Sequence, residues 1–110
     1  MTAAGGVQTA TVLFTDLSGS TALRSRLGED QAERLRVLHD GVVQRAIEGA
    51  RGNVVKSLGD GVMATFVSAA DAVTAAVAVQ QGIDQHNRRV RGEPLAIRVG
   101  LSVGDVTFGG

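Results

Sequence analysis

The chain has no cysteine, which excludes disulfide bonds, thiolate metal sites and thiol nucleophiles and fits a reducing compartment. Its 11 basic and 11 acidic side chains give a formal net charge of zero. No long-range field therefore attracts it to nucleic acid or to an anionic membrane, and a bound phosphate must be held by local groups. The most apolar run, residues 75–79, is far shorter than the ~20 residues of a membrane-spanning helix. We therefore expect a soluble, cytoplasmic protein without membrane insertion or a nucleic-acid partner.

Aromatic residues and proline are also scarce, because the chain contains three phenylalanines, no other aromatic residue and a single proline. The core must be built from Val, Leu, Ile and Ala, whose side chains each bury little area. A length of 110 residues suits one domain with a modest core. Such a core gains stability from a partner subunit.

Residues 11–21 combine a strand-like run with a turn of small residues. Residues 7–15 predict a β-strand, Asp16 follows it, and Ser18-Gly-Ser-Thr21 suits the start of a helix. A strand that ends in an acid and a Gly/Ser/Thr turn can hold a metal beside a phosphate. The acid binds the cation, and free backbone N–H groups of the first helical turn face the phosphate oxygens.

The rest of the chain predicts alternating helices and strands. In order, we expect a short helix ending at Leu27, an amphipathic helix over residues 29–49, strands over 53–58 and 62–67, a helix over 68–87, a strand over 95–103, and a fifth strand from residue 106. Asp-Gly pairs favour tight turns, so Gly59-Asp60-Gly61 predicts a hairpin and Gly104-Asp105 predicts another turn.

This order matches the β-α-β-β-α-β core of a ferredoxin-like α/β (α+β) fold, with an extra helix after the first strand. In that topology the third strand lies antiparallel between the first two. Asp16 and Asp60 should therefore converge at one edge of the sheet. Oxygen ligands without Cys or a well-placed His suit Mg²⁺ or Mn²⁺, and a pair of such ions beside a triphosphate is the arrangement of nucleotidyl transfer.

Three motifs resemble, in order and spacing, the catalytic domain of class III nucleotide cyclases, and more narrowly the bacterial adenylate cyclases of actinobacteria. They are Phe14-Thr-Asp-Leu-Ser-Gly-Ser-Thr21, Lys56-Ser-Leu-Gly-Asp-Gly61 and Arg98-Val-Gly-Leu-Ser-Val-Gly-Asp105. The resemblance implies conversion of ATP to 3′,5′-cyclic AMP and pyrophosphate. The ribose 3′-oxygen would attack the α-phosphorus in line, with two Mg²⁺ or Mn²⁺ ions per site.

The resemblance also assigns roles to residues. It implies that Asp16 and Asp60 are the catalytic, metal-binding aspartates, and that the backbones of Leu17, Ser20 and Thr21 hold the second metal or the triphosphate. Lys56 matches the lysine that reads adenine. A lysine can donate to an adenine ring nitrogen but cannot accept from the guanine amino group. The family's active sites form across an antiparallel homodimer, with the metals from one chain and this lysine from the other.

The chain departs from the family at its C-terminus. Family domains continue through a second adenine-reading residue and then an Asn and an Arg that stabilise the transition state. Each lost donor typically costs on the order of 10² to 10³ in rate. We therefore expect residues 1–110 to be a partial catalytic domain that is nearly inactive alone. The alternatives are a catalytically silent nucleotide-binding or dimerising regulatory domain, a cyclase that uses GTP, and another two-metal nucleotidyl transferase.

Each site residue also has a purely structural interpretation. Asp16 alone can cap a helix, Asp60 can form a turn, and Lys56 can be a solvent-facing strand residue. Ser20 and Thr21 can be helix caps. We expect His39 and His86 at the surface or its boundary, because neither has a partner at metal-ligand spacing.

Overall fold

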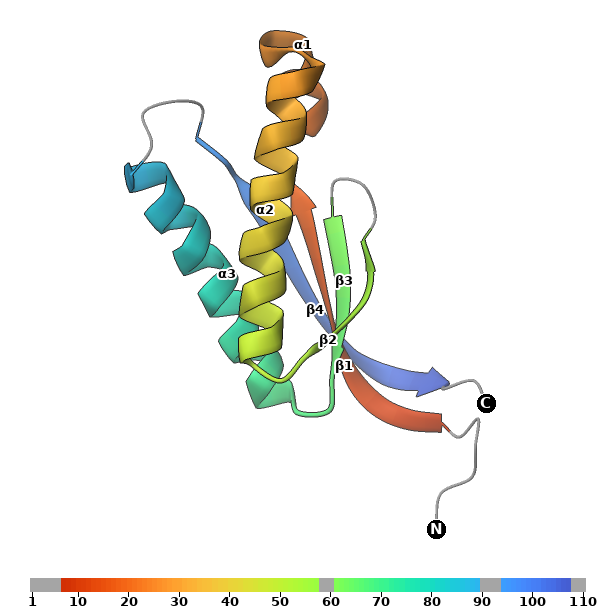
Figure 1. Ribbon diagram of the computed structural model, residues 1–110. Helices are drawn as coiled ribbons and strands as arrows, with labels where there is room; N and C mark the ends of the chain where they lie inside the picture. The colour runs from red at the N-terminus through yellow and green to blue at the C-terminus, as the bar shows by residue number, and fades with distance from the viewer. Residues whose placement is uncertain (1–6, 58–60, 90–93, 108–110) are drawn as a thin grey trace.

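The computed structural model describes residues 7–57, 61–89 and 94–107. The elements are β1 (Val7–Leu17), α1 (Ser20–Leu27), α2 (Glu29–Gly49), β2 (Asn53–Ser57), β3 (Gly61–Phe66), α3 (Ala69–Arg89) and β4 (Ile97–Thr107). Helices α2 and α3 lie side by side over one face of the sheet, and α1 lies at the end where β1 finishes (Figure 1). No helix among these residues is both long and apolar enough to cross a membrane.

The four strands form one sheet in the order β2-β3-β1-β4, and each neighbouring pair is antiparallel. Strand β3 therefore lies between β1 and β2, which confirms the expected ferredoxin-like arrangement. The end of β1 meets the start of β3, where Asp16 pairs with Gly61. This edge of the sheet carries the candidate site.

The expected turn at Gly104-Asp105 and the expected fifth strand from residue 106 are wrong. Strand β4 runs without interruption from Ile97 to Thr107 and pairs with all 11 residues of β1. Gly104 lies opposite Ala10, so β1 offers a hydrogen-bonding partner at the position where the local sequence favours a turn. The long partner strand overrides the local preference. Phe108, the third residue of the expected fifth strand, lies outside the described residues.

The core fills the layer between the helices and the sheet. Its largest fully buried side chains are Phe66, Leu13, Ile47, His39, Val43 and Val79. On β1, the buried side chains of Leu13, Thr15 and Leu17 alternate with the more exposed Phe14 and Asp16. Side chains on a strand alternate between the two faces of its sheet. Phe14 and Asp16 therefore lie on the face without helices, called here the open face.

The N-cap of α1 is Gly19, not one of the serines or the threonine. Gly19 has a left-handed backbone (φ 70°), its carbonyl accepts the Leu23 N–H at 2.9 Å, and it makes no side-chain cap. Glycine adopts positive φ at little cost. In α3 the expected serine cap is present, since Ser68 Oγ accepts the Asp71 N–H at 3.2 Å.

His39 is fully buried, so the expectation that it lies at the surface or its boundary is wrong. It precedes the buried Val43 and Ile47 by four and eight positions and therefore shares their helix face. Its Nδ1 lies 2.9 Å from an oxygen of Asp40, and its Nε2 has no hydrogen-bond partner among the described residues. His86 is partly buried, as expected.

Candidate active site

Asp16 stands at the edge of the sheet, as the last residue but one of β1. Its side chain is 51% exposed on the open face, and its two neighbours across the sheet are Gly61 in β3 and Arg98 in β4. Arg98 donates to Asp16 Oδ2 at 2.7 Å. The Arg98 side chain is itself 73% exposed, so solvent screens this ion pair. The carboxylate is accessible to a hydrated cation or a nucleotide.

Strand β3 starts very close to the end of β1. A Cβ atom at Gly61 would overlap the carbonyl oxygen of Thr15, so only glycine fits this approach. The Val62 N–H also donates to Thr15 Oγ1 at 3.2 Å and fixes the two strand ends together. Asp60 directly precedes Gly61 in the chain but lies outside the described residues.

The turn after β1 presents backbone N–H groups at the start of α1. The Ser18 N–H donates to the Ala96 carbonyl at 2.8 Å. Along α1, the first backbone N–H that donates to a carbonyl of this turn is that of Leu23. The N–H groups of Ser20 and Thr21 precede it and have no partner within the helix. The positive end of the helix dipole adds to their attraction for an anion. The backbone of Leu17 pairs with Ile97, one residue beyond Asp16.

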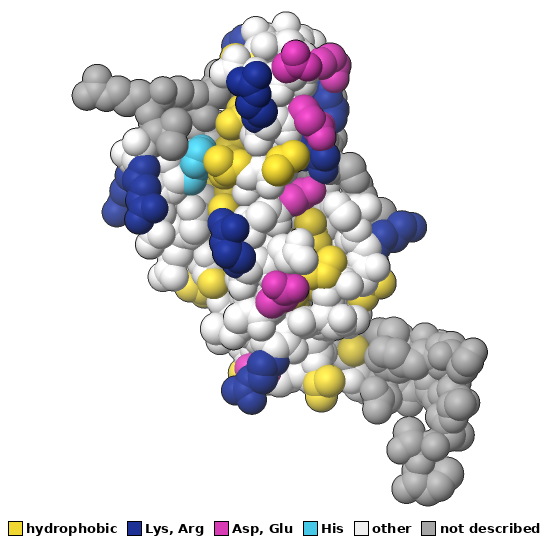
Figure 2. Space-filling model, viewed as in Figure 1, with side chains coloured by type: hydrophobic (Ala, Val, Ile, Leu, Met, Phe, Trp, Pro, Cys, Tyr) yellow, Lys and Arg dark blue, Asp and Glu magenta, His cyan; other side chains and the backbone are white. Residues whose placement is uncertain are grey.

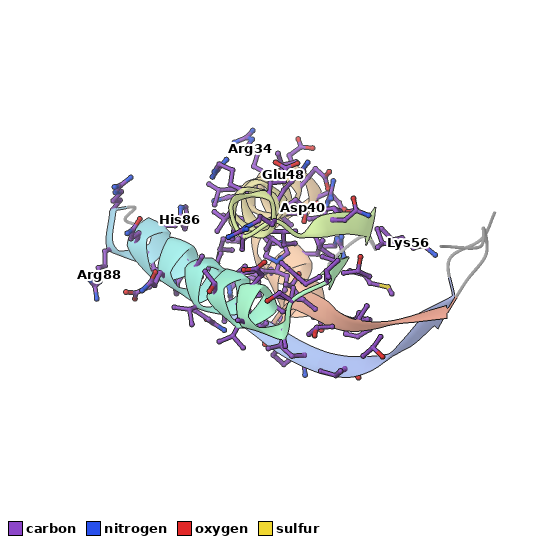
Figure 3. The ribbon with its side chains drawn as sticks, turned by 90° about the horizontal axis from the view of Figure 1, so that it is seen from below. Arg34, Asp40, Glu48, Lys56, His86 and Arg88 are labelled. Carbon is purple, nitrogen blue, oxygen red and sulfur yellow. The ribbon has the colours of Figure 1, made fainter. Side chains whose placement is uncertain are left out.

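Lys56 shares the open face with Asp16. It pairs with Met63 in β3, which in turn pairs with Phe14 in β1, and it projects from β2 on the side away from the helices (Figure 3). Lys56 lies two strands away from β1, and Asp16 lies two residues further along β1 than Phe14. With ordinary strand geometry, these two offsets place the backbone of Lys56 about 12 Å from that of Asp16.

A β-bulge determines which way Lys56 faces. The register shifts between Val54 and Lys56, because Val54 pairs with Ala64 whereas Lys56 pairs with Met63. In a regular ladder Val55 would pair with Met63, and Lys56 would turn to the helix side. The bulge was not expected from the sequence. The three consecutive residues Val54-Val55-Lys56 do not alternate in polarity, and that break is the signal that could have indicated it.

The oxygen ligands at the end of β1 suit a hard cation. Asp16 offers carboxylate oxygen, and oxygen donors are those that Mg²⁺ and Mn²⁺ prefer. Across residues 7–57, 61–89 and 94–107, no three His, Asp or Glu side chains gather into a metal-binding cluster. Mg²⁺ is commonly bound by only one or two carboxylates and keeps waters and substrate phosphates as its other ligands.

Comparison with known proteins agrees with this fold. The family model of the adenylate and guanylate cyclase catalytic domain matches residues 3–110. The chain is 32% identical over 98 residues, 88% of its length, to a protein of Rhizobium meliloti (strain 1021) named, as a provisional assignment, adenylate cyclase 3. It spans 17% of that protein.

Two solved structures share the architecture. A bacterial light-regulated adenylyl cyclase superposes with a TM-score of 0.90 at 24% identity, covering 98% of this chain and 34% of its own. The guanylyl cyclase Cya2 superposes with a TM-score of 0.84 at 23% identity, covering 96% of this chain and 58% of its own. Both likenesses concern the fold, and they include one cyclase of each nucleotide type. With the family model spanning nearly the whole chain, this protein belongs to the class III adenylate and guanylate cyclase catalytic-domain family.

Proposed function

We propose that this protein is an adenylate cyclase that converts ATP to 3′,5′-cyclic AMP and pyrophosphate. The observation that carries the proposal is the pairing of Asp16 with Gly61, which brings an accessible carboxylate beside the residue that follows Asp60. The first turn of α1 begins four residues after that carboxylate. A cation site and a phosphate-binding helix end would then lie side by side, as an in-line attack on the α-phosphorus requires.

Each residue has a distinct task in this proposal. Asp16 and Asp60 hold two Mg²⁺ or Mn²⁺ ions, and the backbones of Leu17, Ser20 and Thr21 hold the triphosphate. When bound, the ions neutralise charge on the attacking ribose 3′-oxygen and on the leaving pyrophosphate. The backbone N–H groups orient the triphosphate so that its α-phosphorus faces the 3′-oxygen.

The choice of ATP over GTP rests on Lys56. The related structures include an adenylyl and a guanylyl cyclase, so the family leaves the base open. An ammonium group has three donors and no acceptor, which suits a ring nitrogen of adenine and not the amino group of guanine. The exposed position of Lys56 on the open face leaves it free to reach a base.

We also propose that the active protein is a homodimer with shared sites and that turnover needs residues beyond Gly110. The open face supports the homodimer, because it presents Phe14, 43% exposed, two residues from Asp16 on β1 and two strands from Lys56. An apolar side chain at that position favours burial against a second chain. The chain covers 17%, 34% and 58% of the three proteins compared above, which supports the need for further residues.

Binding of Mn²⁺ and ATP to the chain tests the site without requiring turnover. Isothermal titration should detect binding of Mn²⁺–ATP to the wild type, and Asp16→Asn and Asp60→Asn should each weaken it roughly tenfold or more, since each removes a charged ligand. Circular dichroism checks that the fold is kept. Unchanged affinity in both variants would contradict the metal site.

Turnover is then measured for two proteins. One is residues 1–110 alone, and the other is a fusion of these residues to the C-terminal part of a related cyclase domain. We expect cyclic AMP from the fusion with Mn²⁺ and ATP, little from residues 1–110 alone, and none from the fusion that carries Asp60→Ala. Binding without turnover in the fusion would support the catalytically silent regulatory domain instead. Cyclic GMP as the main product from GTP would support the guanylate cyclase.

A further inference from the structure

Asn87 links the end of α3 to the segment that leads into β4. Its Nδ2 donates to the Leu95 carbonyl at 2.8 Å, and its Oδ1 accepts the Leu95 N–H at 2.8 Å. A single side-chain amide therefore satisfies both backbone groups of one residue, as a neighbouring strand would. The two bonds join residues eight positions apart and hold Leu95 against the helix.

The last turn of α3 is polar on its outer side. His86, Arg88 and Arg89 lie in this turn, and Figure 2 shows a histidine and Lys or Arg side chains at the surface of that end of the helix layer. Asn87 is partly buried, and both polar groups of its amide are used by Leu95. Its side chain therefore has a fixed partner within the fold, unlike a solvated surface residue.

Leu95 is itself part of the core beneath the turn that follows β1. It is 3% exposed and belongs to a small buried cluster with Leu17, Leu23 and Ile83. Leu17 is the last residue of β1 and Leu23 is the fourth residue of α1, so these two residues flank the turn. Ile83 precedes Asn87 by four positions and shares its face of α3. One face of α3 therefore holds Leu95 by hydrogen bonds and by apolar packing, in the cluster that anchors both ends of the turn.

The residue after Leu95 holds the same turn directly. The Ala96 carbonyl accepts the Ser18 N–H at 2.8 Å. This bond extends the pairing of β1 with β4 by one residue, beyond the pair formed by Leu17 and Ile97. Ser18 is two residues from the start of α1, so its position determines where the first N–H groups of that helix lie. A chain of contacts thus runs from Asn87 through Leu95 and Ala96 to the turn.

We propose that Asn87 is a positioning residue for the turn that binds the triphosphate. It touches neither the nucleotide nor a metal ion. It holds Leu95 and Ala96 in place, and these hold the turn so that the N–H groups at the start of α1 face the phosphate oxygens. The inference rests on the proposed function, because the ligand of the turn is the triphosphate of ATP.

The carboxylate of the site is held in a different way. Asp16 pairs across the sheet with Gly61 in β3 and with Arg98 in β4, and neither contact involves Asn87. Loss of the Asn87 amide should therefore weaken the binding of phosphate and leave the binding of a metal ion alone intact. A general loss of stability would not produce this difference between the two ligands.

Two measurements on Asn87→Ala test the proposal. Hydrogen exchange followed by NMR should show that the Ser18 amide exchanges about tenfold faster than in the wild type, because the two bonds that hold the neighbouring Leu95 are lost. Titration calorimetry should show a Kd for Mn²⁺–ATP that rises about three- to tenfold, while the Kd for Mn²⁺ alone stays within about twofold. Asn87→Asp keeps the acceptor for the Leu95 N–H and loses the donor, so it should give a smaller change of the same kind.

The matched control is Ser68→Ala, which removes the acceptor of the Asp71 N–H at the other end of α3. Loss of a helix cap destabilises a protein, and urea unfolding measures how far each variant is destabilised. Ser68→Ala should leave both the exchange of the Ser18 amide and the Kd for Mn²⁺–ATP unchanged.

The outcomes separate the role of Asn87 from the proposed function. Unchanged exchange of the Ser18 amide in Asn87→Ala, or an equal increase in Ser68→Ala, would overturn the positioning role. An equal rise of the two Kd values in Asn87→Ala would also overturn it, since that result indicates a general structural effect. A wild-type chain that binds no Mn²⁺–ATP would contradict the proposed function and this role with it. Binding by the wild type that Asn87→Ala leaves unchanged would contradict the role of Asn87 alone.

Discussion

Arg98 holds the Asp16 carboxylate by a hydrogen bond between neighbouring strands. Exposed ion pairs typically contribute about 0–1 kcal/mol, so this one can be displaced by a divalent cation. In the protein without a cation, Arg98 neutralises part of the charge of this carboxylate. If Asp16 binds a metal ion, as proposed above, Arg98 competes with that ion for one carboxylate oxygen.

Removing this arginine should strengthen binding of Mn²⁺ in the absence of nucleotide. Because the pair contributes about 1 kcal/mol at most, Arg98→Ala should lower the Kd for Mn²⁺ by up to about fivefold. Electron paramagnetic resonance of free Mn²⁺ measures this affinity without turnover. Arg34→Ala removes the same charge far from the open face and should leave the Kd unchanged. A Kd that rises in Arg98→Ala would contradict this competition, and a Kd that Asp16→Asn also leaves unchanged would mean that Asp16 does not bind the ion.

Reversing the charge of Lys56 should change the base that the protein prefers. Lys56→Glu replaces donors by acceptors, so the affinity for Mn²⁺–ATP should fall roughly tenfold or more while that for Mn²⁺–GTP falls less or rises. The ratio of the two Kd values, measured by titration calorimetry, is the diagnostic quantity. Arg51→Glu makes the same charge change just before β2 and should leave the ratio intact. A constant ratio in Lys56→Glu would mean that this lysine does not read the base.

Two residues mark the limit of inference from sequence at this scale. His39 occupies a core position at four-residue spacing from Val43, but an imidazole is more often found at the surface, and that preference led to the wrong expectation. The orientation of Lys56 depends on a bulge in β2, and a bulge is set by pairing with β3. The local sequence shows neither the core that surrounds His39 nor the pairing of β2 with β3.

At the scale of elements, the site depends on how closely β1 and β3 approach. Gly61 begins β3 opposite Asp16 and directly follows Asp60 in the chain. Its lack of a side chain lets the Thr15 carbonyl lie against it. The spacing between the end of β1 and the start of β3 is therefore set by a glycine.

A methyl group at this contact should destabilise the fold and weaken the site together. Gly61→Ala forces the Thr15 backbone to move, which typically costs about 1–3 kcal/mol, so urea unfolding should show a lower midpoint and titration should show weaker binding of Mn²⁺–ATP. Gly100→Ala is the matched control, since Gly100 lies opposite Phe14 in the same sheet and a Cβ there meets no atom within 4 Å. Equal stability of the two variants would show that the close approach imposes no constraint.

The order of the elements was predictable, and the length of the last strand was not. Periodicity and turn residues indicated the helices and strands through β3 and α3 within a few positions, because each carries its signal locally. The expected break at Gly104-Asp105 failed because Gly104 pairs with Ala10. The convergence of β1 with the start of β3 followed from topology once the order was known. The position of Asp60 itself stays a prediction.

At the scale of the whole molecule, the open face leaves two arrangements for a complete site. Asp16 and Lys56 lie on the same face of one chain, about 12 Å apart. A nucleotide could then contact both residues of a single chain, or it could lie between two chains related by a twofold axis. In the second arrangement each site takes its carboxylates from one chain and its lysine from the other, which is what we propose.

Mixing two inactive variants separates these arrangements. In the catalytically competent fusion, Asp16→Ala and Lys56→Glu should each abolish most cyclic AMP formation. If the sites are shared, a mixed dimer places both defects in one site and leaves the other intact. Random pairing makes half of the dimers mixed, so co-refolded chains should recover about a quarter of the wild-type activity. Co-refolded Asp16→Ala and Asp60→Ala chains are the control, because every shared site then lacks one carboxylate and no activity should return. Failure of the first pair to recover activity, with dimers confirmed by sedimentation, would mean that each site is built from a single chain.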